Sequence, residues 1–92
     1  MSIFLSRQAS RAMSAPGFSA KQGQYLAFIY AYTKLNRVAP PEADMQRYFE
    51  VSAPTVHATI IRLETVGLIT RVPRQARSIR LCIAAGDLPV LE

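Results

Sequence analysis

The sequence predicts a small, mainly α-helical domain in which three helices precede a β-hairpin. The first observation is a long aromatic-rich amphipathic stretch over residues 19–36. The second is a pair of shorter helical patterns, over residues 42–49 and 52–66, joined by a turn of about three residues. The third is a basic loop at residues 73–77 with a short apolar segment on each side. Two short helices followed by a basic-tipped hairpin are typical of a winged helix-turn-helix.

The first helix begins at a predicted capping box. Ser19 is followed three residues later by Gln22, the spacing at which each side chain satisfies a free backbone amide of the other. The helix is expected to continue through about Asn36. Apolar side chains recur along it at helical spacing, and these are Tyr25, Leu26, Phe28, Ile29, Tyr32 and Leu35. We interpret this stripe as core packing rather than as a ligand-binding box.

The pair Pro40-Pro41 separates the first helix from the second. Proline ends a helix and also fits the first turn of the next one. Glu42 and Asp44 then lie near a helix N-terminus, where a carboxylate is favourable by about 0.3–1 kcal/mol. This role accounts for both acids without a catalytic function. The predicted buried face of the second helix consists of Met45, Tyr48 and Phe49.

The third helix has recognisable signals at both ends. Ser52 is a candidate N-cap, and Pro54 lies in the first turn, where the missing N–H has no intrahelical partner to lose. Gly67 is the predicted left-handed stop. The face that should be buried consists of Val56, Ile60 and Leu63.

The hairpin that follows is predicted from two short apolar runs. The first strand is indicated by Leu68, Ile69 and Val72. In residues 78–83 the apolar side chains alternate with polar or small ones, as in a half-buried strand, and they are Ile79, Leu81 and Ile83. The loop between the strands is the predicted wing.

The charge distribution favours a polyanionic partner. The net charge is +5, and no acid occurs over residues 1–41, 51–63 or 65–86. A single cysteine, Cys82, and a single histidine, His57, provide neither a disulfide framework nor a metal site. We find no nucleophile–base pair and no phosphate-cradling glycine loop, so neither an enzyme nor a cofactor is predicted. No apolar run approaches the roughly 20 residues of a membrane span.

The candidate DNA-binding residues lie on the third helix and the wing. Early residues of the second helix of a helix-turn-helix meet base edges in the major groove, and wing arginines reach phosphates or the minor groove. Ile61 is unexpected, because it is apolar on the face turned away from the core. The predicted site consists of Ser52, Pro54, Thr55, His57, Ala58, Arg62, Arg71, Arg74, Gln75 and Arg77.

We divide the chain into three parts. Residues 1–17 are predicted to be a flexible basic arm, with a targeting peptide or a helical extension that packs on a partner as alternatives. Residues 18–83 form the winged helix-turn-helix domain. Residues 84–92 are predicted to be a short irregular tail, which either folds back on the core or contacts a second subunit through Leu88, Val90 and Leu91.

Residues 18–83 resemble the N-terminal DNA-binding domain of the LexA repressor family. The resemblance rests on four segments, namely Ser19-Ala20-Lys21-Gln22-Gly23-Gln24, Ala39-Pro40-Pro41-Glu42-Ala43-Asp44-Met45, Leu63-Glu64-Thr65-Val66-Gly67-Leu68-Ile69 and Ala76-Arg77-Ser78-Ile79-Arg80-Leu81. It implies a three-helix winged helix-turn-helix that binds DNA.

Two departures from the family limit what the resemblance implies. LexA carries a C-terminal latent peptidase domain, for which this chain, ending at Glu92, leaves no room, and we interpret Ala85-Gly86 as a loop dipeptide rather than a self-cleavage site. The base-reading positions also differ around residues 54–58, so the LexA operator is not carried over.

The sequence therefore predicts a prokaryotic, sequence-specific regulator that binds double-stranded DNA, most simply a repressor. The expected location is cytoplasmic and nucleoid-associated, without a membrane or a small-molecule ligand. A homodimer is compatible with the sequence, because a lone winged helix gains affinity by pairing two half-sites. The alternative is a winged-helix protein-interaction module with weak or no DNA binding.

Overall fold

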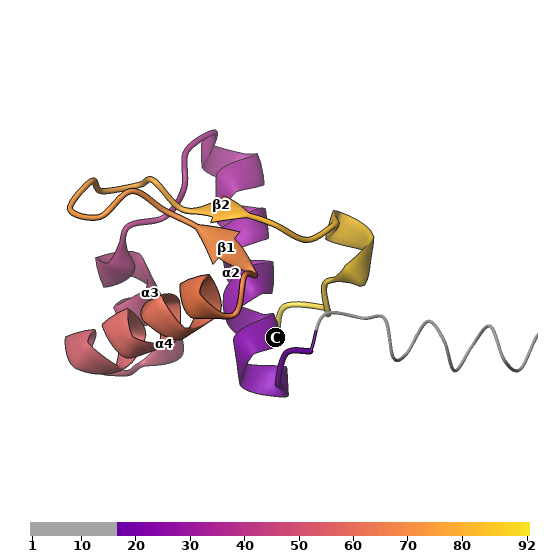
Figure 1. Ribbon diagram of the computed structural model, residues 1–92, viewed down its shortest axis with the longest axis horizontal. Coiled ribbons are helices and arrows are strands. Elements are labelled where there is room, and N and C mark those ends of the chain that lie inside the picture. Colours follow the sequence, from indigo (N-terminus) through magenta and orange to yellow (C-terminus); the bar gives the residue numbers. More distant parts are fainter. Residues whose placement is uncertain (1–16) are drawn as a thin grey trace, which may run out of the picture.

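A computed structural model describes residues 17–92 of the chain. Three helices, α2 (Ala20–Asn36), α3 (Glu42–Phe49) and α4 (Ala53–Thr65), are followed by strands β1 (Ile69–Thr70) and β2 (Arg80–Leu81) and by the 3-10 helix η1 (Ala85–Asp87) (Figure 1). This is the predicted mainly α-helical winged helix-turn-helix. The predicted N-terminal arm lies outside the described residues except for Gly17. Within residues 17–92, no helix combines the length and apolar character needed to cross a membrane.

Helix α2 starts and stops where the sequence predicts. The Gln22 backbone N–H donates to Ser19 Oγ at 3.1 Å, and the Ser19 N–H donates to Gln22 Oε1 at 3.0 Å, which confirms the capping box. The helix ends at Asn36, and Arg37 turns the chain in a left-handed conformation with φ of 65°.

The turn between α3 and α4 brings these two helices together. Pro41 is the N-cap of α3, which places Glu42 and Asp44 in its first turn. Glu50 reverses the chain with φ of 56°. Ser52 then caps α4, because its Oγ accepts from the Thr55 N–H at 3.3 Å.

The C-terminal end of α4 is closed by a Schellman motif. Gly67 has φ of 85°, and its N–H donates to the Glu64 carbonyl at 3.0 Å. The Leu68 N–H donates to the Leu63 carbonyl at 2.9 Å, and both leucine side chains are buried. The predicted glycine stop is therefore confirmed, and it directs the chain straight into β1.

The hairpin ladder is shorter than the two apolar runs suggest. Ile69 pairs with Leu81 and Thr70 with Arg80 in an antiparallel register, and each strand has only two residues. Beyond this ladder the Ser78 side chain replaces backbone pairing. Its Oγ accepts from the Val72 N–H at 2.9 Å and donates to the Val72 carbonyl at 3.1 Å.

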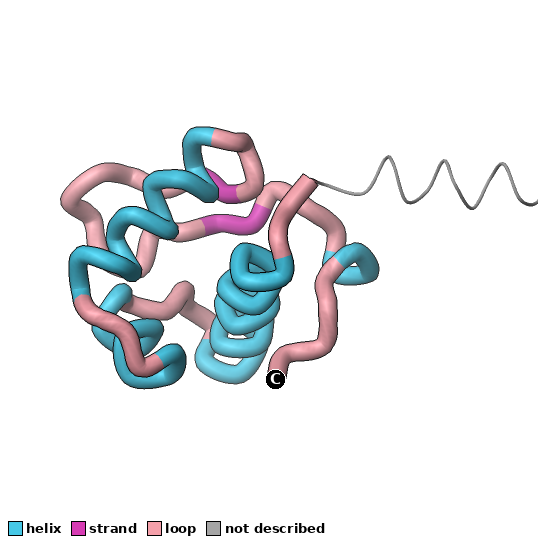
Figure 2. The backbone as a smooth tube through the Cα atoms, turned by 90° about the horizontal axis from the view of Figure 1, so that it is seen from below, coloured by secondary structure: helices cyan, strands magenta, loops and turns pink. Residues whose placement is uncertain are grey.

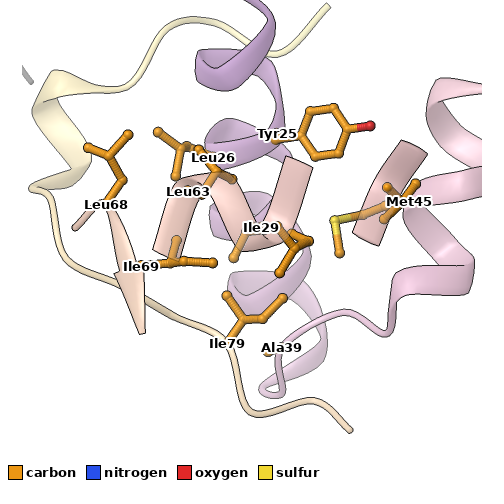
Figure 3. Packing of buried hydrophobic residues seen from close by; sticks show 11 residues of the cluster. Tyr25, Leu26, Ile29, Ala39, Met45, Leu63, Leu68, Ile69 and Ile79 are labelled. Atoms are coloured by element: carbon orange, nitrogen blue, oxygen red, sulfur yellow. The ribbon is translucent and has the colours of Figure 1, made fainter. Parts of the chain in front are cut away.

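The core lies between α2, α4 and the hairpin (Figure 3). Leu26 and Ile29 of α2 meet Leu63 of α4, Ile69 of β1 and Ile79 at the start of the second apolar run. The α4 residues Val56, Ile60 and Leu63 have no exposed surface, which confirms the predicted buried face.

Two predicted core positions are wrong. Leu35 is 82% exposed, because it lies in the last turn of α2, beyond the end of the core. Tyr48 is 42% exposed, since Phe49 takes the inner position and stacks on Tyr25 with ring centroids 4.2 Å apart. Tyr48 instead packs edge-on against Phe49.

The C-terminal segment folds back along α2, as in the first of the two alternatives for the tail (Figure 2). The Gln24 carboxamide donates to the Val90 carbonyl at 2.9 Å and accepts from the Glu92 N–H at 2.8 Å. Leu88 packs against the core cluster, and the Tyr48 hydroxyl donates to the Glu92 carbonyl. The segment thus covers a side of α2 away from the wing.

Candidate nucleic-acid interface

The wing loop and the N-terminal end of α4 extend toward the same side of the molecule (Figure 1). A groove of about 390 Å³ lies between them. The groove is lined by the start of α3, by one α4 side chain and by the wing, with Pro40, Pro41, Glu42, His57, Arg71, Arg74, Gln75, Ala76, Arg77, Ser78 and Ile79 contributing. Three arginines and one acid give this lining a positive balance.

The exposed face of α4 carries most of the predicted reading residues. Ser52, Pro54, His57, Ala58 and Arg62 are all exposed. No acid lies in the α4 sequence before Glu64, so nothing on the first three turns repels a phosphate backbone.

Thr55 is less available than the sequence suggests. It is half-buried, and its Oγ1 lies 3.0 Å from the Ser52 Oγ. Its backbone carbonyl accepts from the Thr59 hydroxyl at 2.9 Å. The Thr55 hydroxyl is thus already part of the helix cap, and a base contact by Thr55 would have to share that hydrogen bond.

His57 faces an acid that the sequence analysis did not include in the site. Its Nδ1 lies 3.3 Å from each carboxylate oxygen of Glu42, and 57% of the His57 side chain is exposed. Fifteen residues separate the two in sequence, so no local pattern could have predicted the pair. The structure places Glu42 inside the candidate interface.

Ile61 is half-buried rather than fully exposed. The apolar side chain that the sequence places on the outward face of α4 is therefore partly covered.

The wing tip is a tight β-turn. The Gln75 N–H donates to the Val72 carbonyl at 3.1 Å, with Pro73 and Arg74 at the two central positions. Arg74 has φ of 65°, and a positive φ at the third position is the requirement of a type II turn. Pro73 suits the second position because its ring fixes φ near the required value. The turn presents the exposed Arg74 and Gln75 side chains to solvent.

The three predicted wing arginines are not equivalent. Arg74 is exposed at the tip. Arg77 is also exposed, but its Nη1 donates to the Tyr32 hydroxyl at 3.3 Å and to the Ala39 carbonyl at 3.4 Å. The Arg71 Nε donates to Glu64 Oε1 at 3.1 Å, and only 15% of the Arg71 side chain is exposed. Charge and position in the chain do not distinguish the three arginines, because they do not reveal internal partners.

Comparison with known proteins agrees with this architecture. Over 61 residues, 66% of the chain, the sequence is 38% identical to the LexA repressor of Thermosipho melanesiensis and 34% identical to that of Thermosipho africanus. The matched part of the chain is therefore similar to a segment of the LexA repressor. The chain spans 31% of the length of each of these relatives. No protein-family model matches the chain.

Both relatives are named repressors. Among the predicted contact residues Thr55 is half-buried, and only 15% of the Arg71 side chain is exposed. The exposed ones are Ser52, Pro54, His57, Ala58, Arg62, Arg74, Gln75 and Arg77.

Proposed function

We propose that this chain binds double-stranded DNA in a sequence-specific manner and regulates transcription as a repressor. The observation that carries the proposal is the presence of an acid-free helix face and an arginine-bearing wing on the same side of one domain. The similarity to proteins named LexA repressor supports it. No catalytic step is required of any residue.

Helix α4 and the wing would make different kinds of contact with DNA. The exposed start of α4 fits a major groove, where Pro54 and Ala58 can contact a thymine methyl and His57 can donate to a base acceptor or a phosphate. Ser52, Thr55 and Arg62 flank this surface. Arg74 and Arg77, with Gln75 between them, would hold phosphates or enter the minor groove, and such contacts are independent of sequence.

A salt series tests the proposal. Fluorescence anisotropy of the full chain with a labelled duplex should show log affinity falling linearly with log salt, with a slope of about −0.9 for each phosphate neutralised. Arg74→Ala should weaken binding to all duplexes and reduce the slope by about one contact. If the chain binds no duplex even at low salt, DNA binding is refuted and a protein-interaction module becomes the better explanation.

Sequence preference and pairing need a separate experiment. Selection of bound duplexes from a random pool should return a motif, and His57→Ala should change the preference at one position by about 1–3 kcal/mol. A palindromic motif would indicate that two copies bind two half-sites, whereas a single unrepeated half-site would argue against a homodimer on DNA. Selection that enriches no motif would refute sequence-specific reading by α4.

A further inference from the structure

The ion pair between Arg71 and Glu64 joins the wing to the reading helix. Arg71 is the first residue after β1, and Glu64 lies in the last turn of α4, at the end that faces β1 in Figure 1. The Arg71 Nε to Glu64 Oε1 distance is 3.1 Å. The ion pair therefore connects α4, before the Schellman turn, with the start of the wing after it.

Glu64 lies at an electrostatically unfavourable position of α4. A carboxylate in the last turn of a helix faces the negative end of the helix dipole, which costs about 0.3–1 kcal/mol when no partner is present. Glu64 is also the only acid over residues 51–86. The one negative charge in α4 and the wing thus pairs with Arg71. This pairing weakens the attraction of Arg71 for an external phosphate.

Apart from the core packing of Ile69 and Ile79, the wing has few contacts that fix its angle to α4. Its ladder contains two residues in each strand, and short two-stranded hairpins are only marginally stable on their own. The Ser78 bridge to Val72 closes the loop on itself, but it makes no contact with α4. Arg77 reaches α2 and the loop after it through Tyr32 and Ala39. Among the side-chain hydrogen bonds and ion pairs of residues 17–92, the one between wing and α4 is that of Arg71 with Glu64.

We propose that Arg71 is a positioning residue, which holds the wing at a fixed angle to α4 through Glu64 and contacts no phosphate. The inference rests on the proposed DNA-binding function. It assigns phosphate contact to Arg74 and Arg77 and makes Glu64, an acid, a contributor to DNA affinity. Charge alone would make Glu64 weaken DNA binding, whereas the positioning role makes Glu64 strengthen it.

The sign of the Glu64 effect provides the test. Glu64→Gln removes a negative charge, so electrostatics alone predicts tighter DNA binding. The positioning role predicts weaker binding, by about fivefold at moderate salt. Asp87→Asn is the matched control, because it makes the same charge change in η1, away from the wing, and should not weaken binding. Tighter binding by Glu64→Gln would overturn the proposal.

Three further variants separate positioning from phosphate contact. Arg71→Gln should weaken binding and leave the salt slope unchanged, whereas Arg74→Gln should reduce the slope by about 0.9. The charge-exchanged variant Glu64→Arg with Arg71→Glu should recover affinity to within about twofold of wild type. A slope reduced by Arg71→Gln to the same extent as by Arg74→Gln would show that Arg71 contacts phosphate.

A measurement without DNA keeps the two proposals distinguishable. Limited trypsin digestion of the full chain should cleave after Arg74 and Arg77 several times faster in Glu64→Gln than in Asp87→Asn, because a released wing opens more often. If wild type fails to bind DNA but this difference is found, the proposed function fails and the positioning role of Arg71 stands. Equal cleavage rates in the two variants would refute the positioning role whatever the DNA result.

Discussion

Gly23 allows a prediction in which two opposite effects can be given magnitudes. The residue is buried in α2, where a Cβ would lie 2.9 Å from Phe18 Cε1 and 3.0 Å from Pro89 Cγ. Glycine is thus the residue that lets the chain before α2 and the tail after η1 pack on the same turn. Gly23→Ala forces at least one of these rings to move.

The two contributions to the free energy of unfolding have different signs. Alanine is favoured over glycine within a helix by about 1 kcal/mol. Overpacking of a filled site costs about 1–3 kcal/mol. Because Phe18 is only half-buried and can move, we take the middle of that range. The expected net effect is a destabilisation of about 1 kcal/mol.

Urea denaturation followed by circular dichroism measures this effect. Gly86→Ala is the control, since no heavy atom lies within 4 Å of its added Cβ and η1 is exposed at that residue. Pro89→Ala should relieve part of the cost in the double variant with Gly23→Ala, by about 0.5 kcal/mol or more. A Gly23→Ala protein that is about 1 kcal/mol more stable than wild type would refute the reasoning. DNA affinity should be unchanged, because the tail packs away from the wing.

Three other changes have expected outcomes. Glu42→Gln should tighten binding to duplex DNA about two- to threefold at low salt, because it removes the acid from the groove lining, and anisotropy against Asp87→Asn checks it. Arg74→Gly and Arg74→Ala should weaken DNA binding to the same extent, because both remove the guanidinium. The free energy of unfolding in urea should be about 1 kcal/mol higher for the glycine variant, since alanine is strained at the positive φ of this position and glycine is not. Ile60→Ala should lower the free energy of unfolding by about 2–5 kcal/mol, as measured by urea titration, because Ile60 is fully buried.

The fold could be predicted largely because its signals are local. The Ser19–Gln22 capping box, the Ser52 cap and the Gly67 stop each depend on a few adjacent residues, and all three are present in the structure. The periodic apolar faces of α2 and α4 also follow from local spacing. The errors at Leu35 and Tyr48 have another cause, because helical spacing gives the direction of a side chain but not where the opposing surface ends.

The site could be predicted only in outline. Composition and order place basic residues on the wing and mainly neutral residues on α4. In the structure Arg74 and Arg77 are exposed, but the Arg71 side chain is only 15% exposed and Thr55 is half-buried. The partners of individual side chains were not predictable, because they come from distant segments. His57 meets Glu42 and Arg77 meets Tyr32 across 15 and 45 residues of sequence, and Arg71 meets Glu64 around a turn. These contacts decide which cations are free to bind, and sequence alone does not contain them.

The backbone of the wing explains why arginine occupies positions that suit glycine. Arg74 and Arg77 have φ of 65° and 59°, a conformation that costs a residue with a Cβ about 1 kcal/mol or more. Glycine at either position would remove the strain but would also remove the guanidinium from the tip or from the Tyr32 contact. At the proposed interface, the chain thus carries local strain at two cationic residues. The more stable Arg74→Gly protein should therefore be the weaker DNA binder, and a variant in which stability and affinity rise together would contradict a charge-holding role for the wing.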